Sequence, residues 1–462
     1  MSRVSLVVGI MLMCLTASPR AQETVVVGLD EAISRAIDTS PDLRSIVIQE
    51  NSSLDAYRWS LREYFPKLGV NYSQNESVLI HSPDTRSVQA GLTLTQLLFD
   101  AGRGGRLKDL SKIQLISGQK DFQIQLEQVT DSVRHLFNQI LVEKKKLEIQ
   151  DQVIDLAGKQ LDISRKEVEL GSSREIDLLD AETQLSSLKT DKKQSQRTLS
   201  DALFQLGNLL GLDSSVPLDI VGDFDTDYPG LQLPEKNDQW LALVLDTSKD
   251  LAQQKLDLRK QYFQMLNAQS WFLPDISLEA SYGLTGTRLP LQTPTYNATL
   301  TFSFPSDAFP TTQTLGLGGT PDQSRTSSAS TKVGVFDSVQ GIVNGATAKA
   351  QYSLSLVKEG TLKATTRYSF EKTMGDYRLL VEKLSLQRHT IEIEEKKNAI
   401  LAKQLELGEA KRLDYLQGET QLAKDRISLV ESVLQVRESE RTLESLMHVE
   451  PGSLGHLAKE AP

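Results

Sequence analysis

The sequence has few aromatic residues, one cysteine and no excess of positive charge. Only 6% of the 462 residues are aromatic, and the formal net charge is −10 at neutral pH. A nucleic-acid partner is excluded, because phosphate binding needs clustered Lys and Arg. Beyond position 21 no stretch approaches about 18 consecutive apolar residues, so no membrane-spanning helix is predicted. If the chain crosses a membrane, it does so with strands.

The segment 1–21 is typical of a secretory signal peptide. Arg3 precedes an apolar run that starts at Leu6, and small residues follow up to Ala21. The sole cysteine, Cys14, lies in that run, so the mature chain is predicted to have no thiol and no disulfide. Loss of the two arginines in this segment changes the net charge from −10 to −12. Export from the cytoplasm is therefore predicted.

The chain contains an internal repeat. The segment from Glu169 to Leu185 aligns without gaps with that from Glu406 to Leu422, and more than half of the aligned positions hold the same residue. The offset between the copies is smaller over their earlier parts, where Pro66 corresponds to Pro274, so the second copy carries an insertion. A repeat of this length indicates that each copy is one structural unit.

Each copy predicts helices, then two strands, a long helix and a return helix. Repeat 1 (22–212) has strands at about 67–75 and 87–98, a long helix at about 102–170 and a return helix at about 173–212. Repeat 2 (238–450) has strands at about 275–284 and 295–305, a long helix at about 337–407 and a return helix at about 410–447. A linker (213–237) separates the repeats, and a tail (451–462) ends the chain.

The long helices and the insertion differ in composition and in the structure that their sequences predict. The helix at 102–170 lacks proline, keeps near-heptad apolar spacing, and at 1.5 Å per residue spans roughly 100 Å. Such spacing indicates helices packed side by side. The insertion falls at 306–335, where Ser, Thr, Gly and Pro dominate with almost no charge. That composition predicts a loop without a core of its own.

The predicted strands have one apolar face and one face of Ser, Thr, Asn and Gly. The apolar face, predicted to contact lipid, carries Val88, Leu92, Leu94, Ile276, Leu278, Leu300 and Phe302. Aromatic residues gather near the strand ends like an interfacial girdle: Tyr64, Phe65, Tyr72, Trp271, Phe272, Tyr282 and Tyr296. The alternative is a half-buried sheet in a soluble domain. Four strands cannot close a barrel, so several copies would have to contribute to one.

These residues resemble the TolC-like outer-membrane efflux and secretion channel family. The resemblance rests on the opening at 29–42, Pro66 and Pro274 at helix-to-strand joints, the joint at 98–103, and two Leu-Gly tips followed by Asp. It implies a mainly α fold with a small β part, in a trimer with a twelve-strand β-barrel in the outer membrane and a helical barrel in the periplasm. The joint at 336–337 departs from it by lacking a Gly-Arg pair.

The resemblance also implies partners. Members dock onto a periplasmic adaptor and an inner-membrane pump, and give substrates an exit without catalysis. The segment 306–335 is then expected at the periplasmic boundary of the membrane, where its excision should leave trimers intact. The rival interpretation is a periplasmic or surface coiled-coil scaffold without channel activity.

The helix turns hold the candidate sites. Acidic residues after the turns, Asp177 and Asp414 with Asp180 nearby, are predicted to line the periplasmic aperture, as the resemblance implies. The alternative is that they complement the positive ends of the helix dipoles. The tip residues, predicted to contact an adaptor or simply to form turns, are Leu170, Gly171, Ser172, Leu407, Gly408 and Glu409.

No catalytic site is predicted. The five histidines show no pairing that suggests a metal site. The glycine clusters at 102–105 and 316–319 fail the dinucleotide-binding pattern, because Leu107 and Pro321 stand where it needs glycine. We therefore expect no enzyme activity, no cofactor and no metal.

Overall fold

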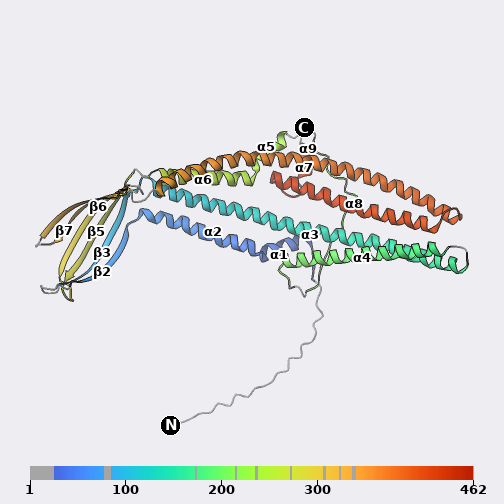
Figure 1. The fold of residues 1–462 in the computed structure, drawn as a ribbon, viewed down its shortest axis with the longest axis horizontal. Helices are drawn as coiled ribbons and strands as arrows, with labels where there is room; N and C mark the ends of the chain where they lie inside the picture. The colour runs from blue at the N-terminus through green and yellow to red at the C-terminus, as the bar shows by residue number, and fades with distance from the viewer. Residues whose placement is uncertain are drawn as a thin grey trace, which may run out of the picture. The chain divides into compact units, whose positions relative to one another are not determined.

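The computed structural model describes residues 25–77, 85–171, 174–213, 216–234, 238–270, 273–304, 309–321, 324–335 and 340–460. The signal peptide and the 336–337 joint lie outside these residues. The helices are α1 (Leu29–Thr39), α2 (Pro41–Ser60), η1 (Leu61–Tyr64), α3 (Arg103–Glu169), α4 (Glu175–Leu209), α5 (Asp238–Thr247), α6 (Lys249–Gln269), α7 (Gln340–Glu406), α8 (Arg412–Met447) and α9 (Leu454–Glu460). The strands are β1 (Val25–Val27), β2 (Lys67–Ser77), β3 (Thr85–Phe99), β4 (Leu218–Ile220), β5 (Asp275–Gly286), β6 (Thr293–Phe304), β7 (Thr311–Thr320) and β8 (Ser324–Val333). Figure 1 labels most of them.

The chain divides into two compact units, and it passes from one to the other five times, three of them within the helices α3, α7 and α8. Unit 1 comprises Met1–Ser40, Glu127–Gly230 and Leu379–Glu438. Unit 2 comprises Pro41–Leu126, Leu231–Arg378 and Ser439–Pro462. Both α3 and α7 have 67 residues. None of the helices in the described part of the chain is long and apolar enough to cross a membrane.

Unit 1 is a bundle of helices with an apolar centre. Its core cluster draws Val153, Ala157 and Leu161 from α3, Ala181, Leu185 and Leu188 from α4, and Leu416 and Ala423 from α8. Spacings of three, four and seven residues place these side chains on one face of each helix. Polar pairs join the same helices: Gln184 Nε2 donates to Thr420 Oγ1 at 2.8 Å, and Gln150 Nε2 to Ser195 Oγ at 3.1 Å. A parallel pair, β1 with β4, completes the unit.

Unit 2 contains a curved sheet of six strands in the order β2-β3-β5-β6-β7-β8, each antiparallel to its neighbour (Figure 1). The pairing of β3 with β5 joins the strands of the two repeats, with Gly91 opposite Gly283. The backbones approach closely there, since a Cβ on Gly283 would lie 2.6 Å from the Ala90 carbonyl oxygen. Small residues are therefore required where the repeats meet.

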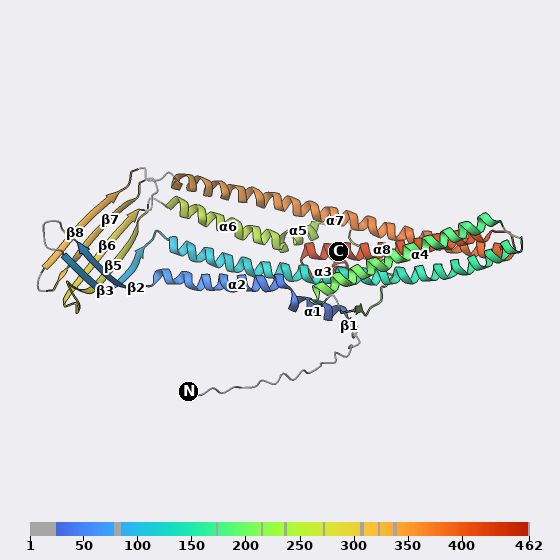
Figure 2. The same ribbon diagram turned by 60° about the horizontal axis from the view of Figure 1, so that its bottom comes forward.

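The prediction that 306–335 forms a loop is wrong. Thr311–Thr320 and Ser324–Val333 are full strands, and their hairpin extends the sheet beyond β6. The segment needs no core of its own, because β7 pairs with β6 and β8 pairs with β7, so the hairpin extends an existing sheet. Threonine is also favoured on a pleated surface. Figure 2 shows this hairpin, β7 and β8, beside β6.

The two faces of the sheet differ as the alternation predicts, with one exception. Leu92, Leu94 and Leu278 are exposed, at 51%, 44% and 39%. Ile276, Leu300 and Phe302 are half-buried. Val88 is 1% exposed and so is not available to lipid. Its register partner is Gly286, where the turn between β5 and β6 folds back and brings Leu291 close.

The aromatic residues predicted to form a girdle are exposed where the structure describes them, but not all of them lie at strand ends. Tyr64 and Phe65 directly precede β2, whereas Tyr72 lies in the middle of β2, and Tyr282 and Tyr296 pair with each other inside β5 and β6. Trp271 and Phe272 lie outside the described residues. Only the rings of Tyr64 and Phe65 have the position expected at a boundary between an apolar phase and water.

Polar contacts fix the joint between β3 and α3. Ala101 and Gly102 have φ of 54° and 76°, so the chain turns sharply there. Asp100 accepts from the backbone N–H groups of Gly102 at 2.9 Å and Gly104 at 2.5 Å, which satisfies donors at the helix start. In a further set of contacts, Arg103 binds Asp275, and Arg106 binds Asn267 and Ser270.

We expect the core of unit 1 to depend on Leu416. This side chain is 1% exposed within the core cluster, so Leu416→Ala should lower the free energy of unfolding by roughly 2–5 kcal/mol. Denaturant titration followed by helical circular dichroism measures the change. The titration is made on the dissociated single chain, and the matched control is Leu179→Ala at the equivalent position of the first repeat, because Leu179 is 55% exposed there. Equal losses in the two variants would contradict this packing.

Candidate functional site at the helix turns

Two tight turns reverse the chain in unit 1, one after α3 and one after α7. Gly171 and Gly408 have φ of 73° and 75°, a conformation that glycine adopts at low cost and that the sequence predicted for both. Gly171 N–H donates to Val168 O at 3.0 Å, and Gly408 N–H to Leu405 O at 3.1 Å. The repeated Leu-Gly sequence thus produces the same helix end twice.

The apolar side chains at the two turns project into solvent. Leu170 is 82% exposed and Leu407 is 74% exposed. Gly171, Gly408 and Glu409 are exposed as well, whereas Ser172 lies outside the described residues. Two exposed leucines at the ends of neighbouring hairpins are available for contact with another protein.

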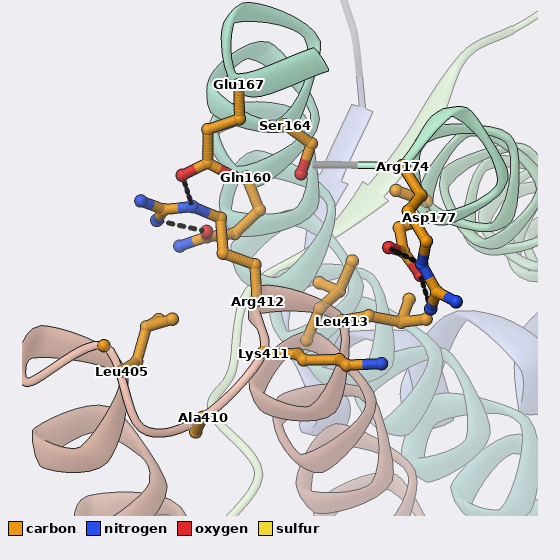
Figure 3. A pocket seen from close by; sticks show the side chains of 13 residues that line it. Gln160, Ser164, Glu167, Arg174, Asp177, Leu405, Ala410, Lys411, Arg412 and Leu413 are labelled. Carbon is orange, nitrogen blue, oxygen red and sulfur yellow. Dashed lines mark hydrogen bonds and ion pairs between the residues drawn. The ribbon is translucent and has the colours of Figure 1, made fainter. Parts of the chain in front are cut away.

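A pocket lies between the turns, with a volume of about 450 Å³. Its lining comes from the end of α3, the start of α4 and the turn between α7 and α8 (Figure 3). Five charged residues line it: Glu167, Arg174, Asp177, Lys411 and Arg412. Three of the charges are positive and two negative, so the pocket is not an acidic site.

Two ion pairs organise these charges, as Figure 3 shows. Arg412 Nε donates to Glu167 Oε1 at 2.7 Å, and its Nη1 lies 3.4 Å from Gln160 Oε1, which ties α8 to α3. Within α4 and its N-cap, Arg174 contacts Asp177 through Nε and Nη2, both at 3.2 Å. The first pair fastens one hairpin to the other, and the second closes the first turn of α4.

The three candidate aspartates do not gather in this pocket. Asp177 lines it, whereas Asp180 and Asp414 are exposed and are not part of its lining. The hydrogen bond from Arg174 holds the pKa of the Asp177 carboxyl below its ordinary value, and Lys411 adds to the effect. Asp177 therefore carries a compensated charge at the start of its helix.

The sequence reasoning missed the basic residues, although a signal was present. Arg174 and Lys411 occupy equivalent places in the two repeats, three residues before Asp177 and Asp414. Arginine or lysine three residues from an aspartate on a helix predicts a local ion pair. The contact of Arg412 with Glu167 had no such signal, because 245 residues separate them in sequence.

A second candidate surface is an open apolar stripe on α7, formed by Leu379, Leu386, Ile393 and Ile400. These residues recur every seven positions and are 50–65% exposed. In the first repeat the matching face of α3 is more covered, and Val142 at the place of Leu379 is 2% exposed. A heptad stripe of large apolar residues is typical of a helix that packs against another helix.

Among the described residues no group of three or more His, Cys, Asp or Glu side chains could hold a metal ion.

A two-faced sheet of strand hairpins and very long helices that reverse at glycine turns are the main features of the fold. Residues 32–212 match the outer membrane efflux protein family. The matched residues cover the first repeat, over which the chain is similar to members of this family. Its members are passive conduits and not enzymes.

Solved channels share the fold over nearly the whole chain. CusC superposes with a TM-score of 0.75 at 16% identity, covering 92% of this chain and 94% of that one. CmeC of Campylobacter jejuni gives 0.74 at 14% identity, with coverage of 91% and 85%. VceC of Vibrio cholerae gives 0.73 at 14% identity, with coverage of 91% and 95%.

We expect Arg174→Ala to return the pKa of Asp177 toward its ordinary value. Because the folded-state pKa is lowered, the pair stabilises the turn above the unfolded-state pKa of aspartate, and this contribution is lost as the pH falls through the lowered value. A carboxyl titration by NMR, with aspartate labelled in the detergent-solubilised protein, measures the shift. Arg174→Lys is the control and should preserve part of the lowering. An unchanged titration in Arg174→Ala would contradict the assignment.

Proposed function

We propose that this chain is the subunit of a homotrimeric exit duct in the outer membrane, extending into the periplasm. It works as a passive conduit with a periplasmic adaptor and an inner-membrane pump, in efflux or in type I secretion. The observation that carries the proposal is that one chain, similar to this family over residues 32–212, combines a two-faced sheet with paired long helices. Water-filled ducts need a wall with a polar inner face, and helices can extend such a wall where strands end.

The open stripe on α7 supports the homotrimer. Its four residues lie on the opposite side of α7 from the buried Leu384, Ile391 and Asn398, so none of the described helices of the same unit covers them. The first repeat offers a matching open face on α4, where Ile176 and Leu179 are 59% and 55% exposed. Each chain therefore presents two uncovered helix faces, one on α7 and one on α4, as a ring of identical subunits requires.

We expect Ile393→Glu to weaken the trimer. Full burial of an isoleucine contributes roughly 1.5–3 kcal/mol, and a carboxylate there also carries a desolvation cost. Native electrophoresis of the detergent-solubilised protein should show loss of the three-chain species. Ala399→Glu is the matched control, since Ala399 is exposed on a different side of the same helix. If both variants remain fully trimeric, the stripe does not join the copies.

The apolar face of the sheet is proposed to contact outer-membrane lipid. Leu92 lies on this face opposite Val70 and Tyr282, while Thr93 lies on the polar face opposite Gly69 and Ser281. Neighbouring residues of one strand thus test the two environments separately.

A charge on the lipid face near the midplane costs roughly 2–4 kcal/mol, so Leu92→Arg should prevent membrane assembly. Thr93→Arg, one residue away on the water-facing side, should be tolerated. Fractionation with a carbonate wash measures the membrane-bound share of each variant. Equal behaviour of the two variants would count against lipid contact, and wild type released by carbonate would favour the scaffold interpretation.

The turns are proposed as the periplasmic end of the duct. Leu170, Leu407 and their neighbouring turn residues would contact the adaptor, and their exposure supports this role. Asp414 and Asp180, which are exposed, and Asp177, whose charge Arg174 compensates, are proposed to line the aperture. Carboxylates around a narrow aperture concentrate cations and can bind multivalent ones.

Single-channel recording in planar bilayers tests the aperture. The double variant Asp177→Ala/Asp414→Ala should lose cation selectivity and become less sensitive to block by trivalent cations. Asp414→Ala alone should account for more of the change, because Asp177 is already paired with Arg174. Unchanged selectivity and block in the double variant would leave these aspartates only the helix-dipole role.

A further inference from the structure

The six strands of the sheet have two origins. β2 and β3 of the first repeat correspond to β5 and β6 of the second, whereas the hairpin of β7 and β8 lies in the insertion that only the second repeat carries. Three copies of the four repeated strands make the twelve-strand wall of the proposed trimer. Such a wall closes only where β6 of one copy pairs with β2 of the next.

In the single chain, β7 already occupies this edge of β6 (Figure 2). The two strands pair at nine positions, from Tyr296 opposite Gly319 to Phe304 opposite Thr311. The strand order makes both β7 and β2 antiparallel to β6. One edge of a strand offers one row of N–H and C=O groups and therefore accepts one neighbour. β7 and the β2 of another copy thus compete for the same place.

The hairpin does not suit a wall that faces lipid. On the side that continues the apolar face of the sheet, β8 carries Arg325, Ser327, Ala329 and Thr331, and β7 places Gln313 there, opposite Phe302. All ten residues of β8 are exposed. The lipid-facing positions of a membrane strand are apolar. The chemistry of the hairpin therefore fits water, in which the single chain exists before it reaches the membrane.

β2 is the better partner for β6 once lipid is present. Its residues on the apolar face include Leu68, Val70 and Tyr72, which are 69%, 81% and 62% exposed. β2 has one glycine in 11 residues, whereas β7 has three in 10. Glycine weakens a strand, because it has no side chain to pack and loses more backbone entropy on ordering. In the described part of the chain, β2 has a neighbour on one side only.

We propose that the hairpin of β7 and β8 is a temporary cover of the β6 edge. It pairs with β6 in the single chain, and it leaves when β2 of the next copy takes its place in the wall. This inference rests on the proposed function, from which it takes the trimer and the membrane. An exposed strand edge pairs readily with wrong partners, and the cover prevents this before assembly.

Disulfides that lock the hairpin onto β6 test the cover. One variant combines Thr301→Cys with Thr314→Cys, and a second combines Phe302→Cys with Gln313→Cys, since each pair lies directly opposite across β6 and β7. Neighbouring pairs of an antiparallel ladder alternate between close and wide spacing, so one of the two has the closer spacing. The only native cysteine, Cys14, is in the predicted signal peptide. No other thiol competes in the mature chain.

The control disulfides lock the hairpin within itself and leave β6 free. They combine Thr314→Cys with Ser330→Cys, or Gln313→Cys with Thr331→Cys, which lie opposite across β7 and β8. Each full mature chain is dissociated, oxidised as a single chain and offered phospholipid vesicles with and without reductant. Carbonate extraction then measures the inserted share, because a wall with an open edge is not stable in lipid.

The chains locked between β6 and β7 should lose the carbonate-resistant fraction, and reductant should restore it. The chains locked between β7 and β8 should insert like the wild type in both conditions. Equal insertion of both locked sets would overturn the cover, and so would equal loss. Failure of the β6–β7 disulfide to form in the single chain would overturn it as well. Failure of the proposed function would be seen separately, as release of the wild type and the reduced variants by carbonate.

Excision of 306–335 distinguishes a cover from a part of the wall. The shortened chain should insert at least as well as the wild type, because β2 of the next copy then has no competitor. Before lipid is added, its single chains should aggregate faster in light scattering, because the β6 edge is open. Loss of insertion would overturn the proposal, since the wall would then need the hairpin. Unchanged aggregation would also contradict a cover.

Discussion

Helices as long as α3 and α7 can bury their apolar positions only against other helices that lie alongside them. No globular core is long enough to cover such a helix, so the heptad spacing of the sequence dictates antiparallel hairpins. In unit 1 this packing produces the cluster around Leu185 and Leu416, with polar pairs such as Gln150 and Ser195 at intervals. The turns, the pocket between them and the open stripe on α7 all follow from where this packing begins and ends.

The duplication gives two copies of one plan, but a single chain cannot give both copies the same surroundings. Leu416 packs on the hairpin of the first repeat, while its equivalent, Leu179, has no hairpin of a preceding repeat to pack against. The reverse holds for Val142, which is covered, and Leu379, which is open. The chain contains the interface in which the second repeat packs on the first. The interface in which a first repeat packs on a second repeat therefore has to be made between chains. Duplication followed by assembly restores equal surroundings for both copies.

Much of this fold could be predicted from the spacing at which apolar residues recur in the sequence. Heptad spacing along 102–170 and alternation along 87–98 are long enough to be unambiguous, and the two Leu-Gly turns have a single low-cost backbone solution. The hairpin at 311–333 could not be predicted, because its alternation rests on Leu315 and Leu317 alone and its serines are common in loops. The contact of Arg412 with Glu167 and the burial of Val88 depend on segments distant in sequence. Periodicity carries no information about either.

The joint after β3 has a mechanical consequence. Asp100 clamps the first amides of α3, while Arg103 and Arg106 hold Asp275 at the start of β5 and the last turn of α6. The first turn of α3 is thereby fastened to a strand and a helix of the other repeat. A rotation of α3 about its axis would have to break these charged contacts or carry β5 with it. The joint therefore holds the start of α3 in a fixed orientation. If the helices twist, the change in orientation has to occur farther along them, away from the sheet.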